Sequence, residues 1–387
     1  MAASDGAPEV LLFVIDAGGG HRAAANALLA AVAQVGAPFR PRLVNLQEVL
    51  APLDFTRRLT GMPMEQAYNV MVRRGMTRFL APMLKVFQAC IRWRQRALSE
   101  RLAEHLRGER PSAVVSLLPN FNAVLRDAVR MAHPGVPFLV LLTDFADFPP
   151  HFWIEPGVDR VIVGSEHAVG QAMSLGVPRV SRISGMLLHP RFYPRRGVAE
   201  RVGVRRALGI ESRALVVLVL FGGKGSPEMK PLCAALLERP GDWRVIAICG
   251  DNPRLFESLG ELEARGAGRL HRLGFTDRVA DYMAASDLLV TKPGPGSLTE
   301  AFHQRLPVVV TCNPYTIPQE RYNARFVEER ALGLVVSHWR QIPDAVARLA
   351  TQPGLLRRCR AGIAALPENR AVYEALEVIG GELEARS

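Results

Sequence analysis

The 387-residue sequence predicts two doubly wound α/β domains that face each other across a cleft. At about 100 to 200 residues per domain, the length suits two domains, each with its own core. Short apolar runs alternate with helix-length periodic segments, which is the pattern of parallel sheets covered by helices. Each half also opens with an apolar run and a glycine-rich turn. Residues 184–201 are loop-like in composition, so we place the boundary there, between domains of residues 1–190 and 191–367.

The first half begins with an apolar run at residues 10–15, which predicts a buried strand. Glycines follow this run, and residues 21–35 are rich in Ala and Leu, as expected of a helix. Further strands are expected at residues 42–46, 113–117, 138–143 and 160–164.

The second half repeats the pattern, with a strand at residues 214–221, a glycine turn at 222–225 and a helix at 227–238. Further strands are expected at residues 244–249, 288–291, 307–310 and 333–335. Ligands of such sheets bind at the carboxyl ends of the strands, so we expect the ligand in the cleft between the domains.

The cysteine and hydropathy patterns indicate in which cellular compartment the protein works. The five cysteines include no Cys-x-x-Cys pair and no His at zinc-ligand spacing, which argues against a disulfide framework or a structural zinc. The apolar run near the N-terminus is too short for a signal peptide, and no window reaches the roughly 18 apolar residues of a transmembrane helix. We therefore expect a cytoplasmic protein, associated peripherally with the inner face of the cell membrane.

Positive charge is concentrated in one segment. The net charge is +11, and residues 55–110 contain twelve Lys and Arg against four Glu. Such a surplus points to nucleic acid, a membrane surface or a phosphorylated substrate. Residues 76–91 place apolar side chains at helical spacing, while Arg78, Lys85 and Arg92 recur on another face, followed by Trp93. This pattern predicts a helix that binds a membrane surface; the alternative is that its apolar side packs on the protein core and that Pro82 interrupts it.

Three glycine turns could bind anions. The first contains Gly19 and Gly20 and lacks both the dinucleotide-binding spacing and the P-loop pattern. A glycine turn before a helix lets backbone N–H groups and the helix dipole approach an anion, although it can also be no more than a tight turn. The second turn contains Gly222, Gly223 and Lys224, and the third, at residues 291–300, leads into a helix. Glu300, about one turn into that helix, is either an ordinary N-terminal helix charge or a ligand for a sugar diol.

Together these motifs resemble a known family. The Gly-Gly-Gly-His-Arg run at 18–22, Thr143-Asp144 with Trp153, the Lys-Pro-Gly-Pro-Gly-Ser-Leu-Thr-Glu run at 292–300, and Pro-Gln-Glu at 318–320 with Asn323 look like the diacylglycerol glycosyltransferases. This family includes the monogalactosyldiacylglycerol synthases and bacterial diacylglycerol glucosyltransferases. It is related to the transferase that adds N-acetylglucosamine to lipid I. The matches run in order from residue 11 to about residue 336.

The resemblance implies the glycosyltransferase B fold, with an N-terminal acceptor domain and a C-terminal UDP-sugar domain. In such folds the final helix crosses back to the first domain, which residues 368–387 could do. The implied reaction is an inverting transfer of a hexose from a UDP-sugar to the free hydroxyl of diacylglycerol, with no metal and no cofactor. The sequence agrees in having no Asp-x-Asp triplet to hold a divalent cation.

The resemblance also assigns donor-binding residues. It places Glu300 at the ribose and Gln319 with Glu320 at the sugar hydroxyls. The uracil and diphosphate contacts would be Phe275 and Thr276, and Gly222, Gly223, Lys224, Gly296 and Ser297. For Phe275 the alternative is a core aromatic, and for Glu320 a solvated helix charge.

Glycosyl transfer to a hydroxyl needs a base, because the hydroxyl proton must be accepted in the transition state. His21 is the leading candidate, since imidazole titrates near neutral pH and a helix N-terminus favours its neutral form. Asp144 is the alternative, as the base itself or as the partner that orients His21. His151 is a third candidate.

Two other functions remain open from the sequence. A UDP-sugar epimerase of the same two-domain fold would act on a soluble substrate and would have no use for the segment around residues 57–96. A nucleic-acid-binding protein is suggested by charge alone, but the chain has 7% aromatic residues and no recognisable binding motif. We therefore expect no nucleic-acid partner.

Overall fold

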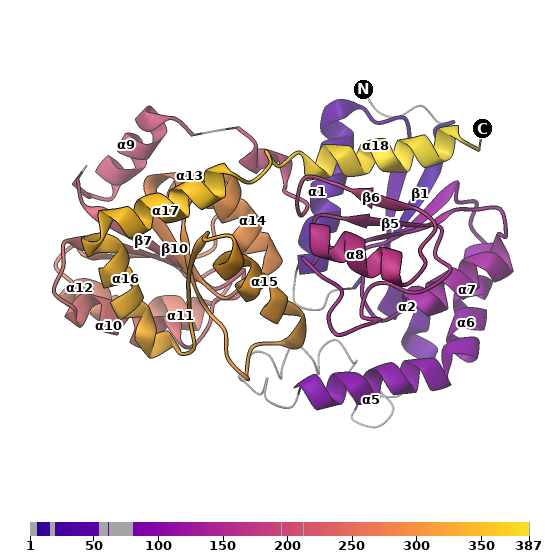
Figure 1. The fold of residues 1–387 in the computed structure, drawn as a ribbon, viewed down its shortest axis with the longest axis horizontal. Helices are drawn as coiled ribbons and strands as arrows, with labels where there is room; N and C mark the ends of the chain where they lie inside the picture. The colour runs from indigo at the N-terminus through magenta and orange to yellow at the C-terminus, as the bar shows by residue number, and fades with distance from the viewer. Residues whose placement is uncertain are drawn as a thin grey trace. The chain divides into compact units, whose positions relative to one another are not determined.

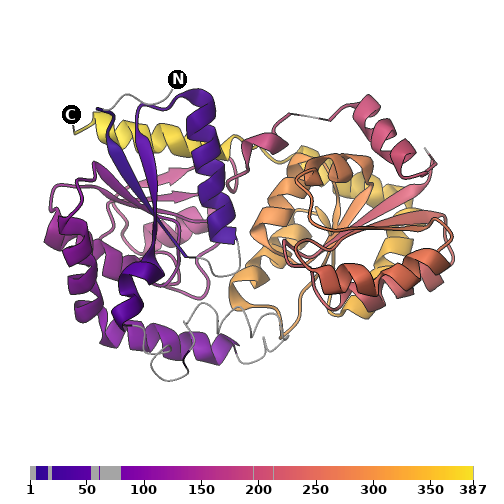
Figure 2. The ribbon, with the colours of Figure 1, turned by 180° about the vertical axis from the view of Figure 1, so that it is seen from behind.

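The computed structural model describes residues 6–15, 20–53, 61, 80–194, 196–211 and 213–386. The chain divides into two compact units. Unit 1 contains residues 1–190, 317–319 and 369–387, and unit 2 contains residues 191–316 and 320–368. Each unit has a six-stranded sheet with helices packed around it (Figures 1 and 2). All strand pairings in the described part of the chain are parallel, which confirms the predicted α/β class.

Unit 1 has the strand order β2-β1-β3-β4-β5-β6. Its strands are β1 Glu9–Val14, β2 Arg40–Asn45, β3 Ala113–Ser116, β4 Phe138–Leu141, β5 Arg160–Val163 and β6 Val180–Arg182. Its helices are α1 Gly20–Val35, α2 Leu46–Leu50, α5 Leu80–Trp93, α6 Gln95–Arg107, α7 Asn122–Ala132, α8 Glu166–Ser174 and α18 Ala371–Glu384. β1 pairs in parallel with both β2 and β3. After β2 has been added on one side of β1, the next strand, β3, is added on its other side, so the strand order of this sheet switches at β1.

The core of unit 1 lies on both faces of this sheet. Five of the six residues of β1 are buried, as expected for a strand covered on both sides. Leu11 and Phe13 share one hydrophobic cluster with Leu102 of α6 and Leu125 of α7. Residues alternate between faces along a strand, so the intervening residues of β1 point toward the opposite face. The helices α1 and α18 pack against each other, and α18 also contacts β3.

The last described helix, α18, belongs to unit 1 (Figure 1), and polar contacts fix it there. Glu382 is 2% exposed and accepts hydrogen bonds from Arg160 Nε at 2.6 Å. Arg179 forms an ion pair with the same oxygen at 2.8 Å. Near the start of the helix, Glu374 accepts a hydrogen bond from the backbone N–H of Ser184. A helix more than 180 residues away in sequence therefore completes the fold of unit 1.

Unit 2 has the strand order β12-β11-β10-β7-β8-β9. Its strands are β7 Leu215–Leu220, β8 Trp243–Ile248, β9 Leu270–Leu273, β10 Leu288–Thr291, β11 Val308–Thr311 and β12 Gly333–Val336. Its α-helices, of which α15 begins with two residues of unit 1, are α9 Val198–Ala207, α10 Met229–Glu238, α11 Pro253–Ser258, α12 Gly260–Arg265, α13 Val279–Ala285, α14 Pro295–His303, α15 Pro318–Glu329, α16 Ile342–Thr351 and α17 Pro353–Ala364. β7 and β10 are neighbours although six helices and strands separate them in the sequence, so the topological switch point lies between these two strands.

The predicted strands are present, with ends that differ by one or two residues. Two strands were not predicted, β6 and β9. Both lie at a sheet edge, and most of their residues are not fully buried, so neither has the apolar run of a central strand. α5 continues to Trp93, with Pro82 in its first turn. Proline is tolerated in that turn, so the expected interruption does not occur within the described residues. No helix in the described ranges is long and apolar enough to cross a membrane.

Replacing Glu382 with Ala should loosen α18, because two arginines would lose the carboxylate that they share. Removing one partner of a buried ion pair costs on the order of 3 kcal/mol, equivalent to about hundredfold faster local opening. Hydrogen-exchange mass spectrometry of residues 371–384 would measure this change. Glu384→Ala is the matched control, since Glu384 is exposed on the same helix. Equal exchange in the two variants would contradict the anchoring role of Glu382.

Candidate functional site

In unit 1, three side chains from distant parts of the sequence meet beyond the carboxyl ends of β1 and β4. His21 is the second residue of α1, and Thr143 follows β4. Nδ1 of His21 lies 3.1 Å from the hydroxyl oxygen of Thr143. The ring of Trp153 packs on His21, with ring centroids 5.5 Å apart. The candidate base is therefore held in place by a hydroxyl and an aromatic ring.

Asp144 belongs to the same cluster. It is 5% exposed, and its Oδ2 accepts a hydrogen bond of 2.9 Å from the indole N–H of Trp153. Trp153 thus contacts both of the leading base candidates, His21 and Asp144. The side chain that contacts His21 Nδ1 is that of Thr143, to which sequence reasoning had assigned no role. His151, the third candidate, has its Nδ1 3.4 Å from a carboxylate oxygen of Glu155.

Burial controls the protonation of His21. It lowers the pKa of the imidazole to about 4, and a hydrogen bond with the backbone of Leu117 opposes this shift by a smaller amount. The ring is therefore neutral at physiological pH and one of its nitrogens carries a lone pair. This is the state in which imidazole accepts a proton.

A buried acid shapes the loop that carries Trp153. Asp147 is 2% exposed, and its two carboxylate oxygens accept backbone N–H bonds from His151 at 3.0 Å and from Trp153 at 2.6 Å. The side chain of Gln171 bonds both the N–H and the carbonyl of Asp147. Burial raises the pKa of Asp147, while these N–H bonds oppose the shift. The only sequence signal for Asp147 was its place shortly after a strand end.

In unit 2, two glycine turns meet at the switch point of the sheet. Gly222, directly after β7, has φ +72°, a conformation that glycine adopts without strain. A Cβ on Gly222 would lie 3.7 Å from Cε of Lys292, which follows β10. Gly225 also has a positive φ, and a Cβ there would lie 2.8 Å from the carbonyl oxygen of Cys249. The second predicted turn and the third therefore lie side by side, with Gly223 between the two constrained glycines.

Two lysines accompany these turns. Lys224 is exposed, and its Nζ lies 2.7 Å from the carboxylate of Asp251. Lys292 lies between the turns, and its Nζ is 3.7 Å from Glu320. Sequence reasoning included Lys292 in the glycine motif but not among the donor-binding residues. Its position beside Gly222 makes it a second candidate for binding an anion.

The third turn leads into α14. Gly294 is the N-cap and Pro295 is the first helical residue, followed by Gly296, which is exposed, and Ser297, which is partly exposed. The N–H groups of a first helical turn have no partner within the helix, so those of Gly296 and Ser297 are suited to an anion. Glu300 lies one turn further along. Burial raises the pKa of its carboxyl to about 7, and Arg191 opposes that shift.

The start of α15 supports the same turn. Glu320 is only 7% exposed, so the interpretation as a solvated helix charge is wrong. A Cβ on Gly294 would lie 3.5 Å from Glu320 Oε1. Asn323 is fully buried and donates a hydrogen bond of 2.8 Å to the carbonyl of Pro293. Gln319 is partly exposed and precedes Glu320 in the first turn of α15.

The proposed uracil contacts follow β9. Phe275 is 77% exposed, so the interpretation as a core aromatic is wrong. The hydroxyl of Thr276 accepts a hydrogen bond from the backbone N–H of Arg278, which shapes the loop. Like the turns after β7 and β10, this loop lies at the carboxyl edge of the unit 2 sheet.

The remaining predicted residues belong to the first glycine turn and to the predicted membrane-binding helix. Gly19 and Arg78 lie outside the described residues, whereas Gly20 is the first residue of α1. On α5, Lys85 and Arg92 are exposed and Trp93 is 86% exposed. Among the described residues, no three His, Cys, Asp or Glu side chains are grouped as metal ligands. Metal independence stays a prediction.

Residues 216–351 match the family model described as the Glycosyltransferase family 28 C-terminal domain. This match lies within unit 2 apart from residues 317–319 and includes all three loops described above. That part of the chain is therefore a glycosyltransferase domain.

Curated relatives extend the similarity to most of the chain. A probable monogalactosyldiacylglycerol synthase of Nicotiana tabacum is 26% identical over 88% of this chain and 64% of its own length. A processive diacylglycerol beta-glucosyltransferase of Bacillus subtilis is 27% identical over 68% of this chain and 67% of its own length. The chain thus spans about two thirds of the length of these relatives. The resemblance found in the motifs is confirmed.

Solved structures agree on the fold. The MurG structure of Acinetobacter baumannii aligns with a TM-score of 0.63 at 14% identity, over 97% of this chain and 99% of that one. At this identity the likeness concerns architecture alone. The predicted glycosyltransferase B fold is confirmed.

Proposed function

We propose that this chain transfers a hexose from a UDP-sugar to the free hydroxyl of diacylglycerol, giving a monohexosyl glycolipid. The proposal extends to inversion at the anomeric carbon and to independence from metal. It is carried by one observation above the others, a neutral His21 held by Thr143 and Trp153 at the end of β1. The relatives named for diacylglycerol glycosyl transfer support the substrate class.

In the proposed reaction, the hydroxyl oxygen of the acceptor attacks the anomeric carbon and its proton passes to His21. The bond from that carbon to the UDP oxygen breaks, and its electron pair leaves with the diphosphate. Attack opposite the leaving group inverts the configuration. Thr143 contacts Nδ1, so we assign Nε2 as the proton-accepting atom. A pKa of about 4 makes the imidazole available but weakly basic, and the buried Asp144 carboxylate would stabilise the imidazolium as it forms.

Unit 2 would bind the donor through the loops at the carboxyl edge of its sheet. We assign Phe275 and Thr276 to uracil, Glu300 to the ribose, and Gln319 with Glu320 to the sugar hydroxyls. The diphosphate would contact the backbone of Gly222, Gly223, Gly296 and Ser297 and the ammonium groups of Lys224 and Lys292. Preorganised N–H groups and charges of this kind can stabilise a leaving diphosphate in place of a divalent cation.

We also propose that α5 docks unit 1 on an anionic membrane surface. Leu84, Phe87 and Ile91 pack on the core of unit 1. That side of the helix is therefore part of the protein core, as the alternative to membrane binding had it. Met83, Val86 and Trp93 recur at intervals of three and seven residues on another side, and they are 45%, 65% and 86% exposed. An exposed apolar stripe beside basic residues is the pattern of an interfacial helix. A lipid acceptor does not leave the bilayer readily, so its enzyme must bind there.

Product analysis with a base variant tests the reaction. The enzyme is incubated with diacylglycerol and UDP-glucose, UDP-galactose or UDP-N-acetylglucosamine, and lipids are identified by mass spectrometry. We expect a monohexosyl diacylglycerol, and His21→Ala should lower kcat at least about a hundredfold, the usual scale of a general base.

The control for this experiment is His167→Ala, which removes an exposed histidine of α8 and should leave kcat unchanged. Near-normal turnover of His21→Ala would move the base to Asp144. Release of an epimerised sugar without any glycolipid would instead support the epimerase.

Donor binding should depend on pH through Glu300. The raised pKa, about 7, leaves this carboxyl largely protonated at about pH 6 and largely ionised at about pH 8. If the carboxylate holds the ribose, affinity for UDP-glucose should rise about tenfold over that interval, because UDP-glucose itself does not titrate there. Calorimetry would measure the dissociation constants. Glu300→Gln should remove the pH dependence, and an unchanged affinity in that variant would reject the ribose assignment.

Liposome co-sedimentation tests membrane docking. Vesicles with anionic lipid should bind the protein and neutral vesicles should bind it weakly. Each basic side chain near an anionic surface contributes about 1 kcal/mol, so Lys85→Gln and Arg92→Gln should each weaken binding about fivefold. Arg107→Gln, an exposed position on α6, is the control. Binding that does not depend on anionic lipid would reject electrostatic docking.

A further inference from the structure

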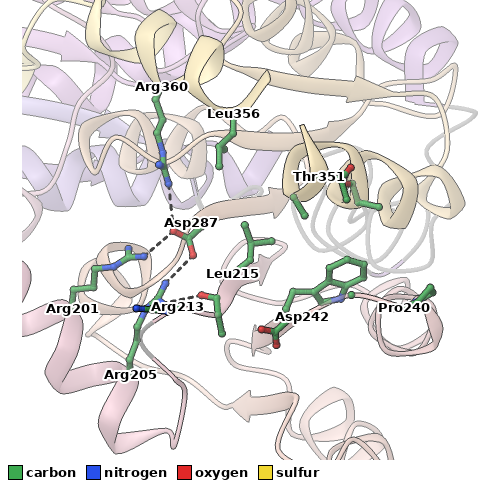
Figure 3. A pocket seen from close by; sticks show the side chains of 15 residues that line it. Arg201, Arg205, Arg213, Leu215, Pro240, Asp242, Asp287, Thr351, Leu356 and Arg360 are labelled. Carbon is green, nitrogen blue, oxygen red and sulfur yellow. Dashed lines mark hydrogen bonds and ion pairs between the residues drawn. The ribbon is translucent and has the colours of Figure 1, made fainter. Parts of the chain in front are cut away.

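Unit 2 contains a pocket at the opposite edge of its sheet from the donor loops. Its volume is about 490 Å³. Figure 3 shows the side chains that line it. Leu215 and Trp243, which line it, are the first residues of β7 and β8, and Asp287 directly precedes β10. The pocket therefore lies at the amino ends of the strands. Gly222 lies beyond the far end of β7, roughly 20 Å away at the usual rise per residue.

One end of the pocket is formed by arginines around Asp287. Arg201 and Arg205, both on α9, each lie 2.8 Å from a different carboxylate oxygen. Arg360 reaches the same carboxylate from α17, at 3.4 Å (Figure 3). A single carboxylate thus faces three guanidinium groups, and Arg213 adds a fourth to the lining.

The four arginines differ in exposure and in the number of hydrogen bonds that they make within the protein. Arg201 donates to the carbonyls of Ala284 and Ser286. Arg205 is 3% exposed and donates to the carbonyls of Ala285 and Ala214, so both arginines tie α9 to the end of α13 and to the residues before β7 and β10. By contrast, the side chain of Arg360 is 49% exposed and its contact with Asp287 is long. Arg213 is exposed. These two positive charges are accessible from the pocket.

The charge around Asp287 is not balanced. Burial lowers the pKa of Arg205, and the neighbouring Arg201 lowers it further, whereas Asp287 opposes both effects. Among the residues that line the pocket, four arginines face two aspartates. The other carboxylate in the lining, that of Asp242, is paired with Arg244 at 2.9 Å. An anion with two negative charges would fit the surplus better than a carboxylate would.

The rest of the wall is largely apolar. It includes Leu215, Pro240, Trp243 and Leu356, with alanines of α16. Ligand sites that combine a few charged groups with an apolar wall usually hold molecules of matching polarity. We propose that this pocket binds a phosphate monoester carried on a small apolar group, with the phosphate at the arginine end. The donor diphosphate is excluded as the occupant, because its loops lie at the other edge of the sheet.

Calorimetric titration with phenyl phosphate, inorganic phosphate and phenyl sulfate tests this site. Phenyl phosphate should bind more tightly than the other two, since only it combines the dianion with the ring. Arg360→Gln and Arg213→Gln should each weaken its binding about tenfold. The control is Arg357→Gln, which should leave binding unchanged, because Arg357 is exposed on α17, the helix of Arg360, but does not line the pocket. Circular dichroism melts of the variants would show that their fold is retained.

Phenyl phosphate could also bind at the glycine turns, so Lys292→Gln is titrated in parallel. Binding that persists in Lys292→Gln and falls in both pocket variants would establish the site. Binding that is lost in Lys292→Gln and kept in Arg360→Gln would overturn the proposal, as would equal affinities of the three probes. Absence of any binding at about 10 mM phenyl phosphate, well above typical small-ligand affinities, would also overturn it.

Discussion

Parallel strand pairing is the constraint on which the rest of this structure depends. In a parallel sheet all carboxyl ends lie at one edge, and each strand must be followed by a crossover that covers a face. The residues that begin these crossovers are therefore brought together without being close in sequence. His21 and Thr143 meet across 122 residues for this reason. The turns after β7 and β10 meet because those strands are neighbours at the switch point.

The sequence was informative where one residue type has one physical use. Apolar runs predicted the central strands, and glycines predicted turns that do need positive φ at Gly222. The edge strands β6 and β9 were not predicted, because strands that are partly exposed do not need a continuous apolar run. The side-chain contacts of the site residues could not be predicted for a different reason. Thr143 and Lys292 belong to motifs that the sequence analysis singled out, but their partners, like those of Asp147, are contacts that only the folded chain creates.

Burial shifts the two central titratable groups in opposite directions but toward the same state. It lowers the pKa of His21 and raises that of Glu300, so both side chains are driven toward their uncharged forms. For a histidine this preserves a lone pair, whereas for a carboxylic acid it removes the anion. The same desolvation thus favours one proposed role and works against the other until a ligand compensates it. Charge at these positions is set by the surroundings more than by residue type.

The anchoring of α18 also has a consequence for synthesis of the protein. Most of unit 1 precedes unit 2 in the sequence, yet Arg160 and Arg179 of unit 1 pair with Glu382, which follows unit 2. At about 5 to 20 residues per second, unit 2 takes roughly 10 to 40 s to emerge in between. During that interval the surface of α1 that α18 covers is exposed. Unit 1 therefore reaches its complete fold only after unit 2 has been synthesised, because α18 follows unit 2 in the sequence.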